Sequence, residues 1–335
     1  MLTMLVHTLP LPTGYTARPA TLADLEPTVA MLNTASRALL DVDTHTVPKW
    51  AREWNMPDWD LNTDSQLILA PDGSVAGLTV VWDFAPHTTL EVWGRVHPDH
   101  LQRGLGTYML RWAEARCAQA VPRASAGARV VAHVGVNQID PATQALVSAE
   151  GYTLVRHNLR MVIALDAPPP APRWPVGVSV RRYVPGQDDR EALSVVRACF
   201  SDHWGYVEEP FEEDLQRWTY FTANDPEFDP SLRLLALAGG QIIGTSYGSL
   251  KVDDDPTMGW ISAVGVLRPW RRQGLAQALI LATFGALYDR GQRKVGLGVD
   301  ADSLTGATRL YEKVGMRADP RHQSGTWERE LRAGM

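Results

Sequence analysis

One kind of segment occurs twice in this chain and restricts the folds that it can adopt. In each copy an apolar run leads through a glycine-containing turn into a segment of helical composition, at 88–120 and again at 259–290. Around both segments the same order of expected elements returns: one strand, two helices, three antiparallel strands, then helix, strand, helix and strand. A repeat of this length indicates a duplicated domain rather than a solenoid unit.

A proline-rich segment separates the two copies. Residues 166–175, DAPPPAPRWP, are half proline, which excludes a helix or a central strand. We therefore expect an N-terminal domain at 1–165, a stiff linker at 166–175 and a C-terminal domain at 176–335. Extended segments at 152–165 and 326–331 are expected to close the two domains. The mixture of strands and helices predicts the α/β class, with a mixed (α+β) sheet in each of two tandem domains.

Composition excludes several classes of function. The chain has 335 residues, enough for two domains that each bury a core. Its formal net charge of −6 argues against nucleic acid as a partner, because phosphate binding needs a basic surface. We expect Cys117 and Cys199 to be buried rather than to form a disulfide or a metal site. Since no apolar run is long enough to cross a membrane, we expect no membrane contact and a cytoplasmic location.

The turn in the second copy has the features of a phosphate-binding site. The first N–H groups of a helix lack intrahelical acceptors and carry the positive end of the helix dipole. Gly274 and Ala276 keep the backbone bare there, and Arg271 and Arg272 add positive charge. The six residues Arg271-Arg272-Gln273-Gly274-Leu275-Ala276 resemble the acyl-CoA signature Arg/Gln-x-x-Gly-x-Gly/Ala of the GCN5-related N-acetyltransferase (GNAT) superfamily.

This resemblance covers nearly the whole chain, twice, since the expected order of elements is also that of the GNAT fold. It implies acetyl-CoA as co-substrate, held by the signature residues and by backbone N–H groups of Val264 and Val266 on the preceding strand. Uncharged, prearranged donors of this kind suit the oxyanion of a thioester under attack. Family members often have Asn near position 303, where this chain offers Ser303 as the CoA contact. No metal is expected.

The end of the second copy resembles the Leu-Tyr-x-Lys-x-Gly-Phe close of the fourth GNAT helix. Tyr311 stands there at the position of the tyrosine that contacts the CoA sulfur in many members. Acetyl transfer expels a thiolate, and a phenol with a pKa near ~10 can protonate it without being ionised at neutral pH. The resemblance therefore implies that Tyr311 is the general acid.

The general base and the acceptor pocket are assigned by position. Residues 200–206, FSDHWGY, lie where family members build the acceptor pocket, and they mix polar and aromatic side chains as small-molecule sites do. We expect Trp204 and Tyr206 to hold the acceptor. The expected bases are His203 and, second, Glu209, because an amine must lose a proton before it attacks.

The first copy is expected to be degenerate. It keeps Arg103, Gly104 and Gly106 for CoA binding but has Leu101 at the first signature position. Val147 stands where the second copy has Tyr311, so the general acid is absent. We expect this domain to be structural or to bind acyl-CoA without turnover. A degenerate copy followed by an intact one is similar in architecture, and in architecture alone, to mycothiol synthase, a tandem GNAT protein.

The expected activity is transfer of the acetyl group of acetyl-CoA directly to an amine of a small molecule, catalysed by the C-terminal domain. The alternative is a non-catalytic acyl-CoA-binding sensor or partner protein, and a longer acyl chain also stays open. The expected partner is a small-molecule amine acceptor, without nucleic acid or membrane, for a chain that is a monomer or a homodimer. The acceptor itself stays open among amino sugars, antibiotics, polyamines, thiol precursors and protein amines.

Overall fold

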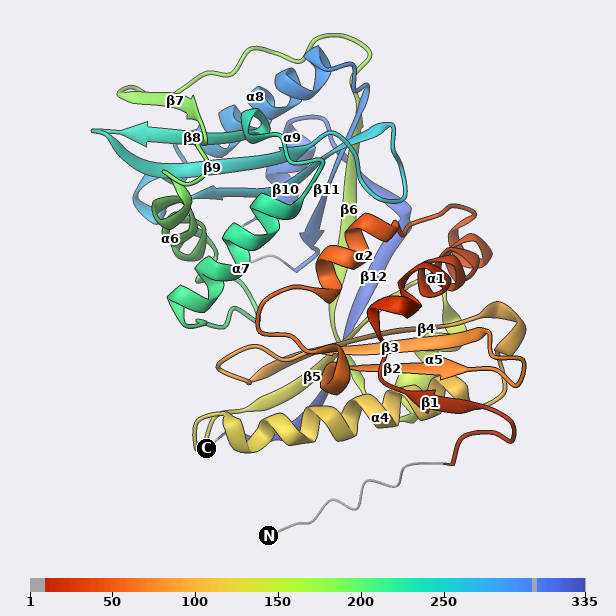
Figure 1. Cartoon of the computed structure of the whole chain (residues 1–335). Coiled ribbons are helices and arrows are strands. Elements are labelled where there is room, and N and C mark those ends of the chain that lie inside the picture. The colour runs from red at the N-terminus through yellow and green to blue at the C-terminus, as the bar shows by residue number, and fades with distance from the viewer. Residues whose placement is uncertain (1–9, 303–305, 335) are drawn as a thin grey trace. The chain divides into compact units, whose positions relative to one another are not determined.

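The computed structural model describes residues 10–302 and 306–334, and it divides the chain into two compact units (Figure 1). The first unit contains the chain up to Arg156 together with the residues from Ser324 on, and the second contains His157–Gln323. Each unit is a mixed β-sheet covered by helices, so the predicted α/β class with a mixed sheet is confirmed. Within the described ranges, no helix is both long and apolar enough to span a membrane.

In its described residues, the first unit combines β-strands with four larger helical segments. The strands are β1 (Thr16–Arg18), β2 (Ser65–Leu69), β3 (Val75–Trp82), β4 (Thr89–Val96), β5 (Val130–Asn137) and the end of β12 (Arg317–Arg332). The helices are α1 (Leu25–Leu40), α2 (Val47–Trp54), α4 (Leu105–Ala120) and α5 (Pro141–Ala149), with one turn of helix, α3, at Leu61–Asp64. The strands follow the order β1-β2-β3-β4-β5-β12, and β4 and β5 form the parallel pair.

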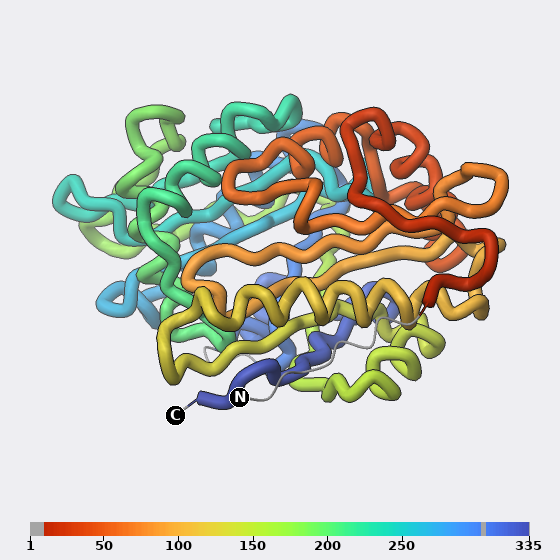
Figure 2. The backbone as a smooth tube through the Cα atoms, turned by 60° about the horizontal axis from the view of Figure 1, so that its bottom comes forward, coloured from red at the N-terminus to blue at the C-terminus, as the bar shows by residue number. Residues whose placement is uncertain are grey.

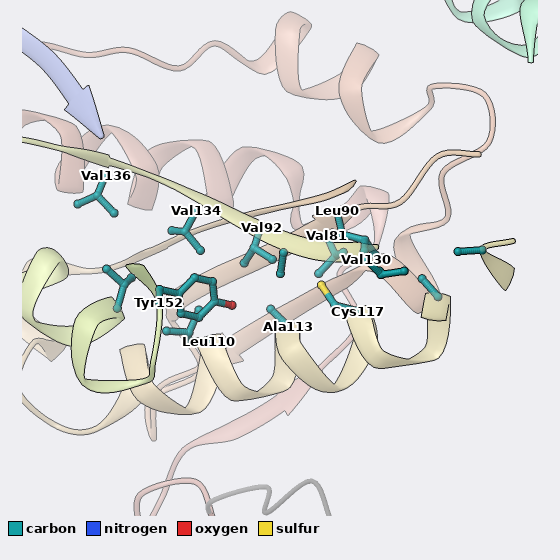
Figure 3. Close-up of a cluster of buried hydrophobic side chains, with 14 residues drawn as sticks. Val81, Leu90, Val92, Leu110, Ala113, Cys117, Val130, Val134, Val136 and Tyr152 are labelled. Atoms are coloured by element: carbon teal, nitrogen blue, oxygen red, sulfur yellow. The ribbon is translucent and has the colours of Figure 1, made fainter. Parts of the chain in front are cut away.

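Alternate side chains of these strands point to opposite faces of the sheet, and helices cover each face. Val81 and Val134 pack against α4 and α5 in one buried cluster, which Figure 3 shows with the strand side chains directed toward α4. The neighbouring Val80 instead packs with Trp50 and Trp54 of α2 on the other face. The sequence pattern of near-continuous apolar strands therefore reflects burial on both sides.

The second unit repeats this arrangement. Its strands are the end of β6 (Thr153–Ala164), β7 (Val178–Arg182), β8 (Arg233–Ala238), β9 (Gln241–Ser249), β10 (Met258–Val266), β11 (Lys294–Asp300) and the start of β12. Its helices are α6 (Asp189–Phe200), α7 (Phe211–Asn224), α8 (Leu275–Asp289) and α9 (Ala307–Lys313). The order β6-β11-β10-β9-β8-β7 makes β10 and β11 the parallel pair. Cys199 of α6 and Cys117 of α4 are both buried free thiols, as predicted.

The two sequence copies exchange their last strands. Residues 158–164 of β6 pair antiparallel with β11 in the second unit, although they close the first copy in the sequence. Residues 324–332 of β12 pair antiparallel with β5 in the first unit. Figure 2 shows the blue C-terminal end of the chain alongside the yellow segment that contains α4 and β5. The chain therefore passes from one unit to the other within β6 and again within β12.

This exchange changes the unit boundaries expected from the sequence. The expected ranges were 1–165 and 176–335, whereas the compact units change over after Arg156 and after Gln323. The proline-rich segment 166–175 connects β6 to β7 inside the second unit rather than separating the two. Proline content marks a segment that cannot join a ladder, but it carries no information about which sheet the preceding strand joins.

Side chains of β12 reinforce its pairing with the first unit. Glu328 accepts hydrogen bonds from Arg129 at 2.6 Å and from His133 at 3.0 Å. Arg332 donates to backbone carbonyl oxygens beyond the end of α4, among them that of Ala128 at 2.8 Å. Both the ladder and these contacts are lost if the strand is removed.

Deletion of residues 324–335 is therefore expected to unfold the edge of the first unit while the second unit keeps its structure. Hydrogen–deuterium exchange should become faster in peptides from β5 and from the end of α4, because β5 loses its antiparallel partner. Peptides from β8 to β11 serve as the internal control and should not change. Faster exchange in the second unit at equal or greater extent would contradict the assignment of β12 to the first.

Candidate functional site

The glycine turns before α4 and α8 have the same backbone geometry. Gln102 and Arg272 both adopt left-handed φ values, of 58° and 62°. Gly104 and Gly274 follow with φ values of 82° and 84° and cap the two helices. A left-handed φ is strained for residues with a Cβ, so glycine is required where the chain enters the helix. Each turn thus presents the free N–H groups of a long helix, a site suited to phosphate groups.

Near its end, the strand that leads into each turn has a paired neighbour on one side only. The parallel pairing of β10 with β11 covers Met258–Ile261 and then stops, while β10 continues to Val266 beside β9. In the first unit the pairing of β4 with β5 covers Thr89–Val92, although β4 extends to Val96. The expected residues Val264 and Val266 lie in the part of β10 beyond the parallel pairing. A strand end of this kind can offer backbone groups to a ligand.

The guanidinium of Arg271 is held by hydrogen bonds within the protein and is not free to bind an anion at the N-terminus of α8. Its Nη1 donates to Asp202 at 2.5 Å, its Nη2 to the carbonyl oxygen of Cys199 at 2.8 Å, and its Nε to that of Val266 at 3.1 Å. The side chain therefore ties the end of β10 to the end of α6. Leu101, at the same position in the first unit, makes no such tie and is 56% exposed.

The other signature residues divide into exposed and buried ones. Arg272 is exposed, and Gln273 is exposed with its amide donating to the carbonyl oxygen of Pro269 at 2.9 Å. Leu275 is buried in the core beneath the helix, whereas Ala276 is partly accessible. Arg272 is thus the signature arginine whose charge is available to an anion. Ser303 lies outside the described residues.

Tyr311 belongs to a buried cluster in the second unit that Val264 also packs against. The side chain is 9% exposed, and burial raises the pKa of its hydroxyl. Among the described residues, no group forms a hydrogen bond with that hydroxyl. A phenol in this setting stays protonated at neutral pH and can donate. Its counterpart Val147 is buried in the corresponding cluster of the first unit, and its side chain has no polar atom.

The segment between α6 and α7 carries the expected acceptor residues, and its Asp202 pairs with Arg271. His203 is exposed, its ring meets that of Phe200 edge-on at 4.7 Å, and partial desolvation lowers its pKa. Trp204 is 39% exposed, a high value for so large an apolar ring. Tyr206 is half-buried. His203 is therefore neutral near pH 7 and accessible, as a base must be.

Glu209 has a different environment from His203. Its carboxylate accepts a hydrogen bond from the buried Arg217, and its backbone oxygen accepts one from Arg197 at 2.6 Å. Desolvation raises its pKa, although the charge of Arg217 opposes this. Asp202, by contrast, has its pKa lowered by the hydrogen bonds from Arg271. A carboxylate held by an arginine is a poorer proton acceptor than a free one, and both residues connect α6 and α7 to their surroundings.

The turn of the first unit adjoins a cavity of about 460 Å³. Its walls include the unpaired end of β4, the first turn of α4 with Gly104 and Gly106, the side of α5, and α1. Arg103 lies on the outside of the turn, where it donates to the hydroxyl of Tyr15 at 3.2 Å and to the carbonyl oxygen of Asp99 at 3.1 Å. The first unit thus has a cavity beside its glycine turn, although Val147 stands where the second unit has Tyr311.

Sequence reasoning missed two parts of this arrangement. The tie between Arg271 and Asp202 joins residues far apart in the chain, and their opposite charges are the only sequence signal for it. The cavity in the first unit depends on small side chains of α1, which carry no motif. Within the described ranges, no three His, Cys, Asp or Glu side chains gather in a way that could hold a metal ion.

Comparison with known proteins identifies relatives of both halves. Residues 195–316 match the model of the acetyltransferase (GNAT) family. A mycothiol acetyltransferase from Frankia casuarinae is 33% identical over 248 residues, which cover 70% of this chain and 67% of the relative. A solved GCN5-related N-acetyltransferase from Sphaerobacter thermophilus is 35% identical, with a TM-score of 0.77 over 97% of this chain and 98% of that chain. A tandem GNAT protein from the clavulanic acid biosynthesis pathway, 17% identical, shares the fold with a TM-score of 0.67, covering 96% of this chain and 100% of that chain.

Replacement of Arg271 by leucine, the residue of the first copy, is expected to loosen the end of α6. The free energy of unfolding of the second unit should fall by about 1–2 kcal/mol, because Asp202 and the Cys199 carbonyl lose charge-assisted hydrogen bonds. Denaturant unfolding measures this change, and hydrogen–deuterium exchange should become faster in residues 199–206.

Arg268→Leu is the matched control on the same turn. Its Nε lies 3.4 Å from Asp202 and its side chain is 63% exposed, so its loss should cost much less. Equal effects of the two substitutions would show that Arg271 contributes only general surface charge.

Proposed function

The chain belongs to the acetyltransferase (GNAT) family, and from this premise we propose that its second unit transfers the acetyl group of acetyl-CoA directly to an amine of a small molecule. As a family member it is an acetyltransferase that uses an acyl-CoA as co-substrate. The observation that carries the finer proposal is the joint presence in the second unit of an unpaired strand end, a free helix N-terminus and Tyr311. The first unit has the first two features and lacks the third.

Acetyl-CoA would lie along the end of β10 and across the N-terminus of α8. The diphosphate would accept hydrogen bonds from the free N–H groups after Gly274, with Arg272 close by as a counter-charge. Backbone N–H groups of Val264 and Val266 would hold the pantetheine arm and the thioester oxygen. Arg271 would contribute indirectly, because it fixes the end of β10 through Val266 rather than binding phosphate itself.

The reaction forms one C–N bond and breaks one C–S bond. The free amine attacks the thioester carbon, and the oxygen takes negative charge that backbone donors on β10 stabilise. The C–S bond then breaks, and the sulfur of CoA takes a proton from the hydroxyl of Tyr311. The nitrogen loses its extra proton to a base on the acceptor side, and exchange with solvent returns a proton to the tyrosine.

Burial supports Tyr311 as the proton donor. A raised pKa keeps the phenol protonated at neutral pH, and a hydroxyl without a partner among the described residues is ready to bind a thiolate. Its packing in the same cluster as Val264 puts it in the region of β10 where the thioester would lie.

His203 is the better supported base of the two candidates. Its ring is exposed and neutral near pH 7, whereas the carboxylate of Glu209 is already bonded to Arg217. The acceptor would lie against Trp204 and Tyr206, whose rings provide apolar area next to polar groups. Glu209 would then act by positioning α7 through Arg217 and Arg197.

The first unit would bind acyl-CoA without turnover. Gly104 and Gly106 leave the backbone of α4 open to a diphosphate, and a cavity follows along β4. Arg103 is exposed at the same turn and would supply a counter-charge. Val147 in place of a tyrosine leaves the leaving thiolate without a proton donor.

The names of the relatives suggest where to look for the acceptor. The Frankia casuarinae protein is called a mycothiol acetyltransferase, so a mycothiol-type amine is the first acceptor to test. Transfer to a different small amine would keep the proposed reaction and change only this detail.

Acceptor-stimulated release of CoA tests the function. The full-length chain should release CoA from acetyl-CoA slowly alone and at least about tenfold faster with a suitable amine, because attack by a held amine replaces attack by water. A panel with a mycothiol-type amine, amino sugars and polyamines, followed by mass analysis of the acetylated product, would identify it. Binding of acetyl-CoA without stimulation by any amine would support a sensor instead.

Tyr311→Phe should lower kcat about 10²–10⁴-fold, the usual contribution of a general acid, while the affinity for acetyl-CoA stays within about twofold. The ring is retained, so packing in the buried cluster should survive. Tyr288→Phe, on the end of α8 beneath the guanidinium of Arg293, is the matched control and should leave kcat unchanged. Equal losses of kcat and of CoA affinity would exclude proton donation as the role of Tyr311.

A further inference from the structure

The cavity in the first unit contains a positive charge that the proposed reaction does not use. Arg95 lies on the end of β4, between Gly94 and Val96, and lines the cavity together with the first turn of α4. Its Nη1 donates to the carbonyl oxygen of Gly94 at 2.8 Å, and its guanidinium carbon lies 5.0 Å from the ring centroid of Trp93. In the part of the chain that the structure describes, no carboxylate lies within ion-pair distance of it.

The acidic side chain that lines the cavity, Asp140, is already hydrogen-bonded to another residue. Asp140 caps α5, where its Oδ1 accepts from the backbone of Thr143 at 3.0 Å and its Oδ2 accepts from the hydroxyl of Thr143 at 2.6 Å. Desolvation lowers the pKa of Arg95, and Asp140 opposes this only through space. An arginine stays charged at neutral pH in any case, so the cavity holds a cation that lacks a direct counter-ion.

The second unit shows that this arginine is not required by the fold. Gly265 occupies the same place relative to the glycine turn, and a Cβ there would lie 2.8 Å from the Cβ of Cys199 on α6. The helix therefore packs directly on the strand in the second unit. In the first unit α1 instead presents Ala35 and Ala38 to the cavity, which leaves room for a long side chain and for a ligand.

We propose that the first unit binds an acyl-CoA whose acyl group ends in a carboxylate, with that carboxylate paired to Arg95. Two groups that can bind an anion line the cavity, the free N–H groups of α4 and the guanidinium of Arg95. Its other walls include aliphatic side chains such as Val92, Val134 and Leu146. The inference rests on the proposal that this unit binds acyl-CoA, and it names the class of acyl group.

The chemistry of the cavity predicts tighter binding of this ligand than of a thioester with an uncharged acyl group. A carboxylate accepts two hydrogen bonds from a guanidinium in a planar, charge-assisted pair, and the gain is large where water is excluded. An acetyl or butyryl group would cover Arg95 with methyl groups and leave its charge unpaired, which costs free energy. The preference should therefore follow the carboxylate rather than the length of the chain.

Succinyl-CoA and butyryl-CoA, which have equal numbers of acyl carbons, test the inference on the full-length chain. Hydrogen–deuterium exchange reads the two units separately, through peptides from 94–107 and from 264–276. Half-protection of 94–107 should need about tenfold less succinyl-CoA than butyryl-CoA, the size of one charge-assisted pair. Free succinate with CoA should not reproduce this protection, because the two anionic groups must be joined. Protection by succinate alone would overturn the acyl-CoA as the ligand.

Variants at Arg95 decide whether this residue causes the preference for succinyl-CoA. Arg95→Met should remove the preference for succinyl-CoA and keep the binding of butyryl-CoA, and Arg95→Lys should keep part of the preference. Arg190→Met, which removes an exposed arginine paired with Glu212 on the second unit, controls for net charge. If Arg95→Met does not fold, the comparison of the two thioesters on the unaltered chain decides by itself.

Two further results would overturn the inference and are distinguishable. Equal protection of 94–107 by both thioesters would contradict recognition of the carboxylate but not the binding of acyl-CoA. If no thioester protects 94–107, acyl-CoA binding by the first unit is contradicted as well. Protection of 264–276 by acetyl-CoA tests the second unit independently.

Discussion

Parallel pairing that stops early is the constraint on which both units depend. β4 leaves β5 after Val92, and β10 leaves β11 after Ile261, so that each strand continues with one edge unpaired. Backbone groups at such an edge need a partner, and a ligand with amide and carbonyl groups can provide one. The glycine turn that follows directs the chain into a helix whose N-terminus points to the same region. The proposed binding site is therefore built mainly from backbone, so its geometry can be the same in two copies with different side chains.

Three positions then distinguish the two copies. At the first signature position Arg271 fixes α6, whereas Leu101 is exposed. One position on the strand is Gly265 in the second copy, where the helix packs tightly, and Arg95 in the first, where a cavity opens. At the end of the repeat, Tyr311 of the second copy stands at the position that Val147 has in the first. Backbone geometry has thus stayed constant in the duplicated halves while the chemistry available at each site has diverged.

The part of this structure that sequence could predict is the part decided locally. The turn at Gly274 and the helix after it follow from residues adjacent in the chain. The repeat, the fold class and the family follow from the order of such local elements along the chain. Arg271 was expected at the phosphate, but its bond to Asp202 depends on how α6 meets β10, which no local pattern encodes. The exchange of β6 and β12 was not predicted either, because both segments are strands in either arrangement and only long-range pairing decides their partners. The role proposed for Arg95 depends on the small size of Ala35 and Ala38, which matters only because α1 packs beside β4.

The exchange of the closing strands sets an order of completion during synthesis. The second unit is one continuous stretch of chain, His157–Gln323, so it needs no residue that follows this stretch. Most of the first unit precedes this stretch, but its strand β5 needs residues 324–332 of β12, which follow the second unit in the chain, as a partner. During synthesis the whole second unit is therefore made before β5 can receive its antiparallel partner, and the edge of β5 stays open until residues 324–332 emerge. The half of the protein that starts folding first is the half that finishes last.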